Sequence, residues 1–184
     1  MRVLIPVFAL VVAGCTRIAV DEPMGRPIAP NELEEFAGEW IGDKEVVFTV
    51  STNENPGGFT ATWMEDGESK SASCVFTMIG KDDVSLIWVK EDELDAYLVF
   101  RVAAGHDSLT LLHPDEEEIE ELVASGELKG LQDEDERAWI LSVEGLEDHL
   151  VGKELWNLAQ AIPFLRKQRT SQESPPGNES ESEE

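Results

Sequence analysis

The sequence predicts a mainly β (α+β) domain: an antiparallel meander that closes into a barrel or half-barrel, with short helices after the sixth strand and at the C-terminus. Runs of alternating apolar and polar residues recur about every twelve residues, as in half-buried strands. The segments between these runs carry turn residues, such as Asn55-Pro56-Gly57-Gly58. Hydrophobic residues make up 41% of the chain, enough for a buried core. Because six or more antiparallel strands twist, they can curl until the sheet hides its own edges.

The first fourteen residues have the composition of a signal peptide. Arg2 provides a positive start, residues 3–12 are apolar without interruption, and Ala13 and Gly14 are small. This apolar run is too short to cross a bilayer core of about 30 Å as a helix. We therefore expect cleavage between Gly14 and Cys15.

The stretch Val12-Ala13-Gly14-Cys15 resembles the lipobox of bacterial lipoproteins. In that family the cysteine becomes the first residue and carries diacylglycerol on its sulfur. The resemblance implies a lipid anchor at Cys15, with acyl chains such as palmitate, in the bacterial cell envelope. Thr16, in the place where an Asp would favour the inner membrane, implies the outer membrane facing the periplasm if the host is Gram-negative. The alternative is an ordinary signal peptide followed by a chance cysteine.

Composition also predicts the segments outside the domain. Residues 15–30 are expected to be a lipidated tether, because Pro23, Pro27 and Pro30 interrupt regular structure. Residues 169–184 are expected to be a disordered tail, since they contain five glutamates and no large apolar side chain. The folded β domain is then residues 31–168.

Within that domain, alternation predicts six strands and a seventh further along the chain: residues 45–51, 59–65, 71–79, 84–90, 97–103, 108–112 and 138–142. A helix is expected after the sixth strand, with acids in its first turn and Gly126 at its end. The leucines from Leu146 to Leu158 predict two short helices that end by Pro163.

A short predicted helix over residues 31–36 leads to Gly38-Glu39-Trp40. This Gly-x-Trp ahead of a meander resembles the motif at the start of lipocalin barrels, where the tryptophan plugs one end. The resemblance implies a lipocalin-like barrel over about residues 38–160 and assigns no catalytic residue. Two features depart from the lipocalin pattern, the short strands and the helix after the sixth one. The block 107–130 is also similar to stretches of uncharacterised bacterial lipoproteins.

The charge balance limits the classes of molecule that the chain can bind. With 14 Lys+Arg against 39 Asp+Glu, the net charge is −25, which argues against nucleic-acid binding. The acidic cluster Asp133–Glu136 could gather Ca²⁺ weakly, but it lacks the glycine turn and ligand alternation of an EF-hand loop. We interpret it as a solvated loop.

The chain shows no arrangement typical of a catalytic or metal site. His106, His113 and His149 lie in or beside turns, share no metal-ligand spacing and are expected to face solvent. No nucleophile elbow or phosphate-binding loop occurs in the sequence. We therefore predict no catalytic residue, no metal and no cofactor.

Cys74 has no partner once Cys15 carries lipid. It shares a strand face with Phe76 and Met78, which predicts a buried, inert thiol. A reactive thiol or an intermolecular bridge is the alternative. The five tryptophans also fit apolar faces, so we expect them to pack in the core, with ligand lining as the second interpretation.

Two non-enzymatic functions follow from these patterns. The barrel could bind a small apolar ligand, which requires a hollow of roughly 300 Å³ or more. Alternatively, the domain is a structural or assembly component that contacts a protein partner in the envelope. An apolar cavity would favour the first function, and a filled core with an exposed apolar patch the second.

Overall fold

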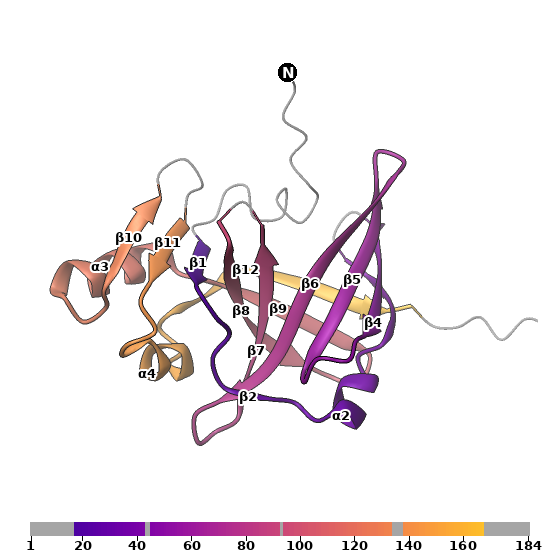
Figure 1. Cartoon of the computed structure of the whole chain (residues 1–184), viewed down its shortest axis with the longest axis horizontal. Coiled ribbons are helices and arrows are strands. Elements are labelled where there is room, and N and C mark those ends of the chain that lie inside the picture. Colours follow the sequence, from indigo (N-terminus) through magenta and orange to yellow (C-terminus); the bar gives the residue numbers. More distant parts are fainter. Residues whose placement is uncertain (1–16, 43–44, 93, 134–137, 168–184) are drawn as a thin grey trace, which may run out of the picture.

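The structure, a computed structural model, describes residues 17–42, 45–92, 94–133 and 138–167 (Figure 1). Eight strands form a closed antiparallel barrel, and the β8–β9 pairing completes the ring. This confirms the predicted mainly β fold. The order around the ring is β3 (Gly38–Ile41), β4 (Val47–Thr52), β5 (Gly58–Glu65), β6 (Glu68–Ile79), β7 (Val84–Glu91), β8 (Ala96–Ala104), β9 (Ser108–Pro114) and β12 (Trp156–Arg166).

Side-chain alternation places one face of each strand inside the barrel. In β5, Phe59, Ala61 and Trp63 are buried in the interior, whereas Thr60 and Thr62 lie half-buried on the outside. Each predicted strand overlaps an observed one, because this alternation is visible in the sequence.

A second layer covers the outer face of the barrel around β7 and β8 (Figure 1). The apolar cluster between the layers includes Leu86, Trp88 and Val99 from the barrel and Ile119 and Leu150 from two helices. All five side chains are fully or almost fully buried, so the domain has one core inside the barrel and one outside. The layer consists of β1 (Arg17–Val20), α3 (Glu116–Ser125), β10 (Gly130–Asp133), β11 (Ala138–Leu141) and α4 (Leu146–Val151).

The segment expected to be a tether is part of the sheet from residue 17 onward. β1 runs antiparallel to β8 and parallel to β11, and Ile18, Ala19 and Val20 are completely buried. Further along, β2 (Arg26–Pro27) pairs with β6. Pro27 lies within β2 and Pro30 begins α2 (Pro30–Glu34), so these two prolines do not prevent regular structure. The segment is anchored by contacts with distant strands.

The second predicted C-terminal helix is wrong. α4 confirms the first, but Leu158 and Pro163 belong to β12, the strand that pairs with β3 and β9 and closes the barrel. Ile162 and Phe164 point into the interior, and the register shifts between Asn157 and Ile162. That irregularity obscures the period of two on which the prediction depends.

The other predicted helices are confirmed. α2 (Pro30–Glu34) lies before β3, and Gly38 between them has φ +131°, a conformation that favours glycine. α3 begins after Asp115, whose carboxylate accepts a hydrogen bond from the Glu117 amide, and ends at Gly126 with φ +82°. Among the described residues, no helix is long and apolar enough to span a membrane.

Candidate functional site

A small apolar cavity lies in the barrel near α2, with a volume of about 60 Å³. Half of its twelve lining residues are aromatic, and none carries a charge. A volume of this size is well below the roughly 300 Å³ of a small-molecule site. Most of the interior is therefore filled by side chains. The lining residues are Phe36, Trp40, Phe48, Val50, Phe59, Ala61, Cys74, Phe76, Ile87, Leu109, Leu111 and Phe164.

Trp40 closes the end of the barrel beside α2. Its indole Nε1 donates a hydrogen bond of 2.8 Å to the Phe36 carbonyl oxygen, and the ring is 4% exposed. The Arg166 guanidinium stacks 4.9 Å from the ring centroid and donates to the Glu35 carbonyl oxygen. Trp40 therefore links α2, β3 and β12, which confirms its predicted packing role, although its ring also forms part of the cavity wall.

Cys74 is a buried free cysteine in the cavity wall. Burial raises the pKa of the Cys74 thiol to about 12, so the thiolate is scarce at neutral pH. This confirms the predicted buried, inert thiol, which shares its inward face with Phe76.

The histidines do not form a common site. His106 is exposed beside Asp107, as predicted, and His149 is half-buried on α4. His113 contradicts the prediction that it faces solvent: it is completely buried in β9, with its ring edge-on to Phe100 at 5.1 Å between centroids. Burial lowers the pKa of His113 to about 4.

The sequence contained a signal for the burial of His113. Leu109, Leu111 and His113 lie at alternate positions of β9, and both leucines belong to the interior core. The inward face therefore continues to His113, although Pro114 directly after it suggested a turn. In the described part of the chain, no protein group forms a hydrogen bond with either ring nitrogen of His113.

The tryptophans confirm the predicted core packing. Trp63, Trp88 and Trp156 are buried like Trp40, and Trp139 is half-buried. Besides Trp40, the indoles of Trp88 and Trp156 donate hydrogen bonds, from Trp88 Nε1 to the Thr77 hydroxyl at 2.7 Å and from Trp156 Nε1 to the Leu150 carbonyl at 3.1 Å.

An apolar row crosses the outer face of four strands on a side of the barrel that the second layer leaves open. Leu165 of β12 lies opposite Ile41 of β3, which lies opposite Val47 of β4. The register of β4 with β5 puts Met64 next in line. Leu165 and Met64 are 60% and 61% exposed, and the middle two are half-buried. We call these four residues (Leu165, Ile41, Val47 and Met64) the exposed row.

Several predicted features lie outside the described residues: Gly14 and Cys15 at the proposed lipidation site, residues 134–136 of the acidic cluster, and the tail. Within the described part, no group of three or more His, Cys, Asp or Glu side chains is arranged to hold a metal ion.

Comparisons with protein-family models, with curated proteins and with solved structures gave no match. The candidate site is therefore defined by its own geometry: a nearly filled barrel, a closed end at Trp40 and an exposed outer apolar row.

Proposed function

We propose that this chain is a lipid-anchored protein of the bacterial cell envelope that contacts a protein partner and carries out no catalysis. The filled barrel interior carries this proposal. A cavity of about 60 Å³ leaves too little space for a small-molecule ligand, so the outer surface is the better candidate for binding.

The exposed row supports this choice. Its two end side chains, Leu165 and Met64, are more than half exposed, although the protein carries a net charge of −25. Burial of such side chains against a partner contributes roughly 25 cal/mol per Å² of apolar area.

The position of β1 limits how far the domain can lie from a lipid on Cys15. β1 begins at Arg17, whose guanidinium is 3.8 Å from the carboxylate of Glu91 at the end of β7. Only Thr16 separates this strand from Cys15, so a lipid on Cys15 would hold the start of β1 within about 7 Å of the anchored residue. The domain would then sit directly on the membrane surface, where its partner would also be found.

The anchor is tested by Cys15→Ser and membrane fractionation. We expect the wild-type chain to stay in the membrane pellet after a high-salt wash and the variant to be released. A variant that stays in the washed pellet would show that the anchor at Cys15 is wrong.

The choice between partner and ligand is tested with two variants. Met64→Asp places a charge in the exposed row, whereas Ala61→Leu enlarges a side chain of the cavity wall and fills the cavity. In cells treated with a cross-linker, we expect a discrete adduct with another protein that is lost in Met64→Asp and kept in Ala61→Leu.

Binding of a small apolar ligand is the second candidate function, supported by the fully apolar lining of the cavity. Native mass spectrometry of the detergent-purified chain distinguishes the two. A stoichiometric apolar molecule that is present in the wild type and absent from Ala61→Leu would favour ligand binding over the proposed partner contact.

A further inference from the structure

The barrel is closed, but the β1–β11–β10 extension ends in a free edge. Among the described residues, β10 lies at the end of the strand order and pairs with β11 on one side only. Figure 1 shows it at the outer margin of the molecule, next to α3. A free edge carries unpaired backbone N–H and C=O groups, which can hydrogen-bond to a strand from another chain.

The register identifies the backbone groups at this edge. The Ser142 amide donates a 2.8 Å hydrogen bond to the Lys129 carbonyl, so this opposed pair is bonded across the two strands. In an antiparallel ladder, bonded and non-bonded pairs alternate. The N–H and C=O groups of Gly130 and Gln132 therefore point away from β11, toward the free edge.

Leu131 adds an apolar contact at the same place. It is 78% exposed, more than any other large hydrophobic residue in the described part of the chain. Ile140, its partner across the ladder, packs against the barrel core. Leu131 therefore lies on the same face of the sheet as Ile140, one strand nearer the free edge. A strand added beside β10 could cover Leu131 with one apolar side chain.

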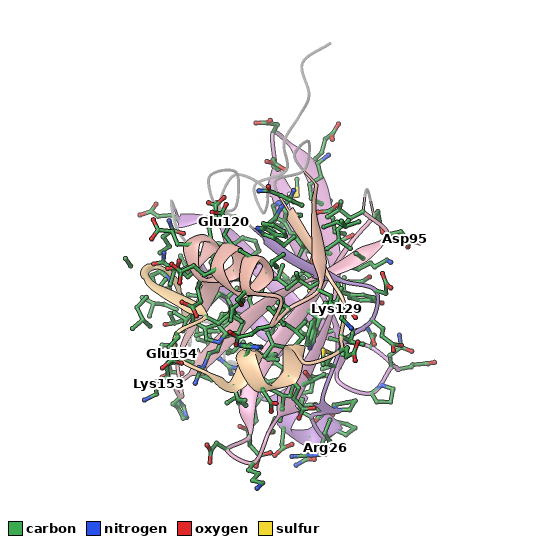
Figure 2. All side chains as sticks on the ribbon, turned by 90° about the vertical axis from the view of Figure 1, so that its left-hand side faces the viewer. Arg26, Asp95, Glu120, Lys129, Lys153 and Glu154 are labelled. Atoms are coloured by element: carbon green, nitrogen blue, oxygen red, sulfur yellow. The ribbon has the colours of Figure 1, made fainter. Side chains whose placement is uncertain are left out.

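The charges around β10 indicate the composition of that strand. From Asp115 to Asp133 the chain has eight acidic residues and a single base, Lys129, which is 2.7 Å from the carboxylate of Glu144. Figure 2 turns this side toward the viewer and shows α3 across it, with Glu120 and Lys129 labelled. Cationic side chains are attracted to such a surface, whereas a second copy of this chain would bring two acidic helices together.

We propose that β10 binds one extended, lysine- or arginine-rich segment of a partner protein, which adds to the sheet as a strand beside Gly130 and Gln132. The proposal rests on the proposed function only in taking the partner to be a protein. The exposed row lies elsewhere on the barrel, so a partner that binds there leaves this edge to be tested separately.

The test uses the full chain in nonionic detergent and a blocked heptapeptide of alternating lysine and valine. We expect binding at low salt that weakens as salt screens the charges. Hydrogen exchange at the amides of Gly130 and Gln132 should slow on binding. The same peptide N-methylated at every residue has no backbone N–H on either edge, cannot pair as a strand and should leave exchange at both amides unchanged.

Two variants at one position make the test specific. Gln132→Pro removes the outward N–H and leaves the bonds to β11 in place, and should lower the affinity about tenfold or more. Gln132→Ala keeps that N–H and should bind the peptide as the wild type does. Thermal midpoints of both variants confirm that each one is folded.

Three results would overturn the proposal. The first is no binding of the peptide to the wild type at millimolar concentration and low salt. The second is equal affinity of Gln132→Pro and Gln132→Ala. The third is equal affinity for the N-methylated peptide, since the contact would then depend on charge alone. If partner cross-linking through the exposed row persists in any of these cases, the proposed function still stands.

Discussion

Trp40 and His113 are both buried aromatic side chains of the barrel, but their ring nitrogens differ in hydrogen bonding. Trp40 satisfies its indole N–H on the Phe36 carbonyl and supports Arg166 on its face. His113 is buried against Phe100, and no protein group in the described part of the chain bonds to its ring nitrogens. A buried polar group without a hydrogen bond costs about 1–3 kcal/mol. Trp40 should therefore stabilise the fold strongly, and His113 should make its stability depend on pH.

Truncation of Trp40 to alanine should lower the free energy of unfolding by about 3–5 kcal/mol, because it leaves a cavity and removes the link between α2 and β12. Urea unfolding measures this loss. Leu158→Ala is the control, since Leu158 is 75% exposed and its truncation should cost less than about 0.5 kcal/mol. Equal losses in the two variants would mean that Trp40 does not hold the closed end.

His113 should destabilise the protein in mild acid. Its folded pKa of about 4 lies below the ordinary value of 6.5, so the unfolded chain binds the proton more readily. The free energy of unfolding should therefore fall as the pH drops from about 6.5 to about 4, by about 3 kcal/mol from this group.

The measurement is urea unfolding at pH 7 and pH 4.5 for the wild type, His113→Phe and His106→Phe. The decrease between the two pH values should be smaller in His113→Phe than in the wild type. His106→Phe, which changes an exposed ring, should behave like the wild type. The same decrease in all three proteins would exclude His113 as its source.

Among the secondary-structure elements, β1 and β12 connect parts of the chain that are far apart in sequence. β1 joins the barrel at β8 to the extension at β11, and β12 closes the ring between β9 and β3. Neither was predicted as a strand. β1 is short, and the register of β12 shifts part-way along.

Ile18→Ala tests whether β1 is an integral part of the fold. Because Ile18 is completely buried between the layers, the variant should lose about 2–5 kcal/mol in urea unfolding. Leu131→Ala, on the exposed edge, should change stability by less than about 0.5 kcal/mol. A loss at Ile18 no larger than at Leu131 would mean that this segment detaches from the sheet in solution.

For the molecule as a whole, two buried clusters oppose a large excess of negative charge. One cluster fills the barrel and the other lies beneath α3, α4 and β1. The net charge of −25 creates repulsion within the compact state that salt can screen.

Raising NaCl from about 20 mM to about 300 mM should therefore raise the thermal midpoint by a few degrees. Differential scanning calorimetry measures it, with an equal osmolality of glycerol as the control for general solvent effects. A midpoint that falls with salt would show that attractive ion pairs outweigh the repulsion.

The approximate bounds of seven of the strands, the start and end of α3 and the burial of Cys74 and Trp40 could be predicted from the sequence. Alternation, capping and turn residues act over a few neighbouring positions, where the sequence displays them directly. The closure of the barrel by β12, the place of β1 and the filled interior were decided only in the tertiary structure. Each depends on strands that are distant in the chain, as when Leu165 pairs with Ile41, or on how large side chains from many strands share one interior. Local patterns carry no information about such pairings or about the space that remains between side chains.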